Sequence, residues 1–210
     1  MTDGDVNIAT GRSLAVSAPG TTLNGTATLT VNGSITGNLT VNAGATVKGS
    51  GTTGALTLAG GILAPGNSPG ILNTGALSLG GGTLALELNG ATAGTGYDQI
   101  NVTGTVSLSA NTAFTLTLGF TPAVNDIFVL INNDSTDAIA GAGRLVFGGV
   151  TLNEGAIFDV GASSFRISYA GGTSNNDLVL QAVPEPGTAV ALFGGIGTLL
   201  GLQRFRRRSR

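Results

Sequence analysis

The stretch Gly54-Ala-Leu-Thr-Leu-Ala-Gly-Gly-Ile-Leu-Ala64 returns 21 residues later as Gly75-Ala-Leu-Ser-Leu-Gly-Gly-Gly-Thr-Leu-Ala85. In both copies leucine alternates with a small or hydroxylated residue, the period-two pattern of a β-strand with one buried face. A unit of about 20 residues cannot bury that face alone, but stacked copies cover one another. The repeat therefore predicts an all-β body of stacked units, a β-solenoid.

A shorter repeat extends this pattern toward the N-terminus. Leu29-Thr-Val-Asn32 recurs ten residues later as Leu39-Thr-Val-Asn42. Asparagine favours turns, and stacked asparagines can form amide ladders, which we expect for Asn32 and Asn42. We assign residues 1–96 to solenoid repeats.

The composition excludes several classes of function. Residues 1–183 carry ten acidic and four basic side chains, which is the opposite of a nucleic-acid-binding surface. The chain has neither cysteine nor histidine, so disulfides, thiolate or histidine metal sites and Ser–His or Cys–His nucleophile pairs are excluded. We expect no metal site, no cofactor and no nucleic-acid partner.

Aromatic residues mark a second region, residues 97–182. Phenylalanine is absent before this region and occurs six times within it. The open end of a solenoid is a sheet edge that needs a cover, so we expect an aromatic-rich β-cap here. The phenylalanines are Phe114, Phe120, Phe128, Phe147, Phe158 and Phe165.

Catalysis would have to rely on paired carboxylates, as in glycosidases. Between residues 13 and 86 the only charged side chain is Lys48, so no acidic face is visible there, and we expect a protein that is not an enzyme. The acidic candidates are Glu87, Asp98, Asp126, Glu154 and Asp159.

Two further patterns suggest binding. The pairs Thr26-x-Thr28 and Thr115-x-Thr117 would form a polysaccharide- or ice-binding face if threonines aligned on successive repeats. Gly171-Gly-Thr-Ser-Asn-Asn-Asp177 has some likeness to a calcium-binding nonapeptide, but a turn held by Asn and Asp side chains is favoured.

The C-terminus consists of three parts in a fixed order. A proline-rich linker at 183–187 (Val183, Pro184, Glu185, Pro186, Gly187) is followed by an uncharged stretch that predicts a membrane helix at 188–203. We expect the linker to be extended and outside any sheet. Arginine clusters stay on the cytoplasmic side, so residues 204–210 form a cytoplasmic tail and the body lies outside. The arginines are Arg204, Arg206, Arg207, Arg208 and Arg210.

This tripartite order resembles the PEP-CTERM sorting signal of Gram-negative bacteria. The resemblance implies export, transient anchoring in the inner membrane and processing near Pro-Glu-Pro by an exosortase-type membrane protease. The start, Met1-Thr-Asp-Gly-Asp-Val, has neither the basic nor the apolar run of a signal peptide, so we expect the repeats to be truncated at the N-terminus.

The turn Ala64-Pro-Gly-Asn-Ser-Pro-Gly70 resembles the passenger-associated strand repeat of autotransporters. Stretches at 97–106, 165–172 and 176–180 are similar to the C-terminal part of such proteins. This resemblance implies a right-handed parallel β-helix.

Together these features predict an exported, non-catalytic structural or adhesive protein of the cell surface or extracellular matrix. Its expected partners are the exosortase, the inner membrane and an extracellular polysaccharide. The alternatives are a polysaccharide- or ice-binding solenoid and a carbohydrate-active enzyme.

Overall fold

The computed structural model describes residues 4–17, 19–134 and 137–185. These residues form 21 β-strands and no helix, which confirms the predicted all-β class for the described part of the chain. The predicted helix at 188–203, Pro186, Gly187 and the five arginines of the tail lie outside the described residues.

Most strands belong to three sheets, which we call A, B and C, and within which most neighbours are parallel. Sheet A contains β1 (Asp5–Ile8), β4 (Thr28–Val31), β7 (Thr46–Gly49), β9 (Ile62–Pro65), β12 (Thr83–Leu88), β15 (Thr112–Leu118), β17 (Leu145–Phe147) and the antiparallel β18 (Val150–Leu152). Sheet C contains β3 (Thr21–Leu23), β6 (Leu39–Asn42), β8 (Leu56–Ala59), β11 (Leu77–Leu79) and β14 (Val106–Leu108).

Sheet B begins with the pair β2 (Ser13–Leu14) and β5 (Ser34–Ile35). Single parallel bridges from Ser34 to Thr52 and from Thr52 to Asn73 join this pair to the remaining strands. Those strands are β10 (Ile71–Thr74), β13 (Gln99–Val102), β16 (Ile127–Asn132), β21 (Asp177–Val183), β20 (Ser163–Gly171) and β19 (Ile157–Val160).

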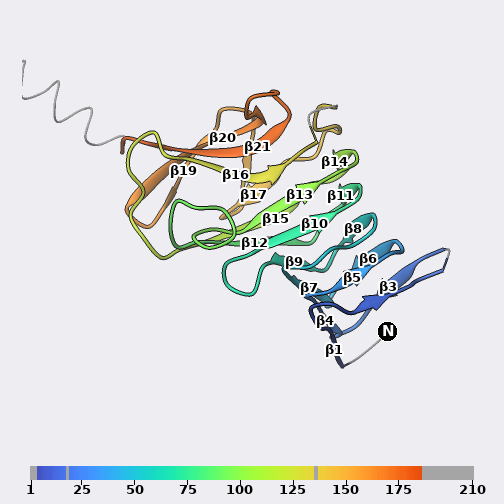
Figure 1. Ribbon diagram of the computed structural model, residues 1–210. Helices are drawn as coiled ribbons and strands as arrows, with labels where there is room; N and C mark the ends of the chain where they lie inside the picture. Colours follow the sequence, from blue (N-terminus) through green and yellow to red (C-terminus); the bar gives the residue numbers. More distant parts are fainter. Residues whose placement is uncertain (1–3, 18, 135–136, 186–210) are drawn as a thin grey trace, which may run out of the picture.

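The chain visits the three sheets in the order A, B, C and then returns to A. Each such pass adds one strand, or one bridged residue, to each sheet, so that successive passes lie one above the other (Figure 1). The 21-residue repeat sets the register, because Leu56 pairs with Leu77 and Leu63 pairs with Leu84.

The ten-residue repeat has a different meaning. Its two copies, β4 and β6, lie in different sheets of the same pass, so Asn32 and Asn42 do not stack on each other. Each bonds to an asparagine from another pass: Asn42 Nδ2 donates to Asn24 Oδ1 at 2.7 Å, and Asn67 Nδ2 donates to Asn32 Oδ1. A longer amide ladder joins Asn73, Asn101 and Asn132 on the outside of sheet B.

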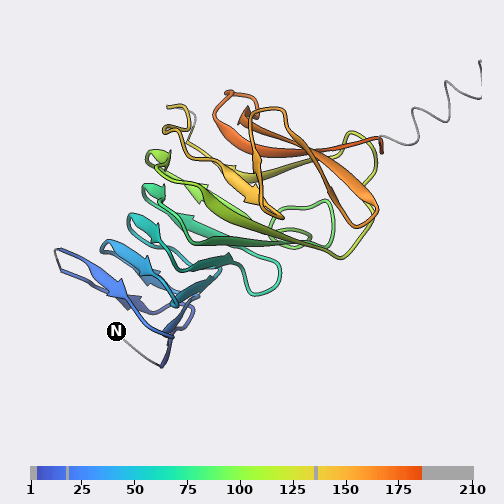
Figure 2. The same ribbon diagram turned by 180° about the vertical axis from the view of Figure 1, so that it is seen from behind.

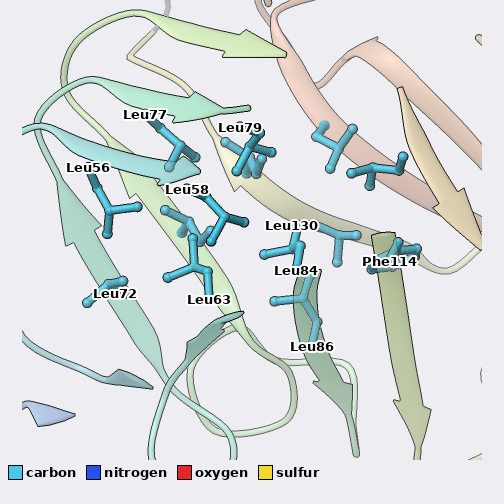
Figure 3. Close-up of a cluster of buried hydrophobic side chains, with 14 of the residues drawn as sticks. Leu56, Leu58, Leu63, Leu72, Leu77, Leu79, Leu84, Leu86, Phe114 and Leu130 are labelled. Atoms are coloured by element: carbon cyan, nitrogen blue, oxygen red, sulfur yellow. The ribbon is translucent and has the colours of Figure 1, made fainter. Parts of the chain in front are cut away.

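The core lies between the sheets and consists mainly of leucine. Alternating strand residues point inward, so that Leu56, Leu58, Leu77 and Leu79 stack in layers and are fully buried (Figure 3). Burial of a leucine side chain stabilises a fold by about 1.5–3 kcal/mol, and the stack repeats this contribution at every pass.

The end of the stack away from the N-terminus is covered by antiparallel strands. There β21 pairs antiparallel with β16 and β20, and β19 pairs antiparallel with β20 (Figures 1 and 2). The phenylalanines of the second region gather beneath these strands, and Phe128, Phe158 and Phe165 form consecutive ring contacts. The pairing of neighbouring strands therefore changes from parallel to antiparallel where the aromatic residues begin to fill the core.

Candidate functional site

An open cleft of about 380 Å³ lies on the outer face of sheet A. We call it the turn cleft, because the turn 65–70 between β9 and β10 forms its wall. Its other lining residues come from four neighbouring strands of sheet A, β7, β9, β12 and β15, and from Asp98. Those that matter for its chemistry are Lys48, Ala64, Ser68, Ala85, Glu87, Asp98, Thr115 and Thr117.

The turn takes its shape from its prolines and glycines. Pro65 ends the strand, and Gly66 has a positive φ of 90° that suits glycine. The backbones of Gly66 and Gly49 exchange two hydrogen bonds, at 2.9 and 3.0 Å, which fasten the turn to the previous pass. Ser68 also has a positive φ, 74°, which is uncommon for a residue other than glycine.

Asp98 clamps this turn from beneath. Its side chain is 2% exposed, and its two oxygens accept hydrogen bonds from the backbone N–H groups of Gly70 and Glu87, both at 2.8 Å. Loss of solvation raises the pKa of Asp98 to about 6, although the two N–H donors partly oppose the rise, and the nearby charge of Glu87 adds to it. The carboxyl group thus holds the turn and β12 together.

The raised pKa gives a testable pH dependence. In the folded chain Asp98 binds a proton with a pKa of about 6, compared with 3.8 for an unperturbed side chain. Between these two pH values the folded state binds more protons than the unfolded state. The contribution of Asp98 to stability is therefore complete below about pH 3.8 and is lost as pH rises through 6. We expect this group to lower the free energy of unfolding by up to about 3 kcal/mol between about pH 4 and 7.

Urea unfolding at several pH values, for wild type and Asp98→Asn, measures this effect. The variant should show a shallower fall with pH whatever its absolute stability. It should keep a residual slope, because burial also raises the pKa of Asp177. Parallel pH profiles for the two proteins would contradict the assignment to Asp98.

Of the five acidic candidates, the structure brings Glu87 and Asp98 together at the turn cleft. Ser68 Oγ donates a hydrogen bond to Glu87 Oε2 at 2.6 Å. The other three carboxylates accept bonds elsewhere, from Ala123 N–H to Asp126, from Tyr169 N–H to Glu154 and from Ser164 Oγ to Asp159. Sequence reasoning did not identify Ser68 or Lys48 as site residues, although the Pro-Gly-Asn-Ser-Pro-Gly turn was a visible signal for the first.

The threonine pairs chosen from the sequence do not form a long row. Thr28 lies opposite Thr46, but the next residue in that row is Ile62, and Thr115 lies opposite Ala85. A continuous row occurs instead on sheet C, where we name it the hydroxyl column. It consists of Thr22, Thr40, Thr57, Ser78 and Ser107, paired in register over five strands.

The turn that ends at Asp177 is joined to the residue that follows β16 by a side-chain bond. Asp177 Oδ1 accepts a hydrogen bond from Asn133 N–H at 2.9 Å, and Asn175 has a left-handed φ of 57°. Among the described residues no group of three or more acidic, histidine or cysteine side chains is placed to hold a metal ion.

The linker predicted from the sequence begins inside the sheet. Val183 is the last residue of β21 and pairs with Ser164, so the expectation that the segment lies outside any sheet was wrong for this residue. Pro184 and Glu185 follow without regular structure and are exposed, and with Val183 they line a hollow of about 370 Å³ beside the loop at 121–124. In the described part of the chain, no helix has the length and apolar character needed to cross a membrane.

No family model matches the chain, and no curated protein matches it significantly in sequence.

Proposed function

We propose that this chain is an exported, non-catalytic structural or adhesive protein of the cell surface, sorted through a C-terminal PEP-CTERM signal. The observation that carries the proposal is the order of features after the last strand. Pro184-Glu185-Pro186 follows β21 directly, and an uncharged stretch and five arginines come next. This is the order of an exosortase-processed tail.

The body fits such a cargo, and we propose that it is a right-handed parallel β-helix with a β-cap. Supporting this are the parallel register within sheets A, B and C and the antiparallel strands at one end. A narrow stack of hydrogen-bonded strands with a leucine core gives a stiff rod without disulfides, which suits a structural component outside the cell.

The position of the motif also suits processing. Pro184 and Glu185 are exposed immediately after the last strand, and Pro184 lacks the N–H group that continued pairing of the strand would use. A protease groove accepts an extended, unpaired peptide. We therefore propose that the exosortase contacts residues 183–187, with the inner membrane as the second, transient partner.

Replacing Pro184, Glu185 and Pro186 together by alanine tests the sorting proposal. The chain is produced behind an export signal peptide in a Gram-negative host that has an exosortase, and the membrane and extracellular fractions are compared. We expect the wild type to be shortened and released, and the variant to stay full-length in the membrane.

The matched control is the double change Thr121→Ala with Pro122→Ala, which alters the loop beside the motif. This control should be processed like the wild type. Normal shortening and release of the triple-alanine variant would refute the sorting assignment.

The hydroxyl column favours a second role, the binding of an extracellular polysaccharide. No charged residue occurs in the strands of sheet C, so the outer face presents threonine, serine and asparagine groups that both donate and accept hydrogen bonds. Five strands at about 4.8 Å, each of three or four residues at about 3.3 Å, span roughly 280 Å². A stable protein dimer needs about 800 Å² per partner, so a repeating polymer suits this face better than a second copy.

The carbohydrate-active enzyme is the least supported role. Glu87 and Asp98 satisfy the requirement for two neighbouring carboxylates, but both oxygens of Asp98 accept backbone hydrogen bonds. A catalytic carboxyl must reach the substrate as an acid, base or nucleophile, whereas this one is committed to the turn. The pair is better explained as part of a binding cleft.

A further inference from the structure

We propose that the turn cleft on sheet A is a saccharide-binding subsite that takes sugar units of a neutral polysaccharide. This inference rests on the polysaccharide-binding role and assigns it a second, more enclosed contact on another face. The volume of about 380 Å³ lies within the range of sites for small ligands.

The floor of the cleft is small and apolar. Ala64 and Ala85 directly follow Leu63 and Leu84, which pair across β9 and β12, and Ala85 pairs with Thr115 on β15. The three strands provide a surface about 10 Å wide, because neighbouring strands are about 4.8 Å apart. Methyl groups on such a floor accommodate the C–H face of a sugar ring without a large side chain in the way.

The rim of the cleft carries the polar groups that sugar hydroxyls need. Glu87 is a charged acceptor, and Ser68 Oγ already donates to its Oε2 at 2.6 Å, which fixes the orientation of the carboxylate. Thr117 pairs with Glu87 across the strands and adds a hydroxyl, and Lys48 adds an exposed donor beside Ala64. These groups come from β7, β12, β15 and the turn, so a ligand would contact several passes at once.

The balance of charge decides the class of ligand. Lys48 and Glu87 carry opposite single charges at the rim, and the carboxylate of Asp98, buried below them, is already bonded to two backbone N–H groups. The carboxylate of Glu87 would repel a polyanion, and the ammonium of Lys48 would repel a polycation. A neutral polyol satisfies both groups through hydrogen bonds and meets no repulsion.

The cleft is preorganised rather than assembled on binding. The Asp98 clamp and the Gly49–Gly66 backbone bonds hold the turn in place. A Cβ at position 66 would lie 2.4 Å from Asp98 Oδ1, so the turn can approach the carboxylate this closely only with glycine there. Fixing the wall before the ligand arrives reduces the entropy lost on binding.

Co-sedimentation of the full chain in mild detergent with cellulose, chitin and insoluble starch tests the inference. Glu87→Gln removes the charged acceptor but keeps the shape, and Ala85→Leu fills the floor. We expect Glu87→Gln to weaken binding about ten-fold or more, since a hydrogen bond to a charged group contributes at least that factor. Ala85→Leu should weaken binding at least as much, because its side chain occupies the space of the sugar ring. The control Asp5→Asn, on a distant strand of the same sheet, should change binding by less than about two-fold. Thr57→Val in the hydroxyl column reports separately on binding through sheet C.

The outcomes separate this inference from the broader role. Unchanged binding by Ala85→Leu, with loss of binding by Thr57→Val, would overturn the subsite and leave a polysaccharide-binding protein that uses sheet C. Absence of wild-type binding to all three polysaccharides would overturn both, as would thermal hysteresis in place of polysaccharide binding. Melting curves of Glu87→Gln and Ala85→Leu that match the wild type ensure that a loss reports on the cleft and not on folding.

Discussion

Replacing Phe128 by alanine is expected to lower the free energy of unfolding by about 4 kcal/mol, a large share of the roughly 5–15 kcal/mol that stabilises a typical domain. The side chain is fully buried in β16. Its ring makes edge contacts with Tyr97 at 5.4 Å, Phe120 at 6.0 Å and Phe165 at 6.3 Å between centroids. It therefore joins the last parallel pass to the antiparallel strands that cover it.

The neighbouring residue provides a matched control. Ile127 lies on the other face of the same strand and is 60% exposed, so Ile127→Ala should cost less than about 0.5 kcal/mol. Urea unfolding followed by circular dichroism measures both changes. Equal losses for the two variants would show that β16 does not divide a buried face from an exposed one.

Gly33→Ala is expected to destabilise the N-terminal passes by about 3 kcal/mol, at the upper end of the cost of overpacking. A Cβ at Gly33 would lie 2.1 Å from the carbonyl oxygen of Arg12 and 2.4 Å from that of Ala9, both in the previous pass. Gly51 occupies the equivalent corner one pass later, where a Cβ would lie 2.2 Å from Gly33 O. Successive passes stack this closely at the corner between sheets A and B because neither position carries a side chain.

Gly161→Ala is the control for this change. Gly161 has a left-handed φ of 61°, but a Cβ there would meet no atom within 4 Å, so only the backbone cost of about 1 kcal/mol applies. Thermal unfolding compares the two variants. A Gly33→Ala protein as stable as Gly161→Ala would mean that the passes are not packed backbone to backbone at this corner.

The sequence predicted the class of fold where the repeat was regular. Leu56–Leu58 and Leu77–Leu79 have the same period and spacing, and the structure pairs them in the register that the 21-residue offset requires. The ten-residue repeat did not show whether its two copies lie in one sheet or in two, because strands of different sheets bury alternate residues in the same way. Periodicity along the chain reports burial but does not say which sheet a strand joins.

The passes differ in length, and this made both candidate sites difficult to predict from the sequence. The hydroxyl column joins residues whose spacing changes between passes, from Thr40↔Thr57 to Ser78↔Ser107, because loops of different length are inserted. The same effect separates Glu87 from Asp98, which meet only because the segment between β12 and β13 folds back under the turn. A sequence scan could name both carboxylates among five candidates but had no means of pairing them.

The end of the last strand was also difficult to predict. Val183 looks like the start of a linker because Pro184 follows it, yet its backbone completes β21 against Ser164. Proline limits its own pairing and the conformation of the residue before it, but an extended conformation is the one a strand uses. The effect of proline on the residue before it was therefore compatible with Val183 in a linker and with Val183 in a strand. Pairing with Ser164 decided between the two.

The most direct test of the sorting claim is the intact mass of the chain that an exosortase-bearing Gram-negative host releases when it is produced behind an export signal. We predict a released species whose C-terminus lies within residues 183–187 and that lacks all five arginines of the tail. A released species that still ends at Arg210 would contradict the claim.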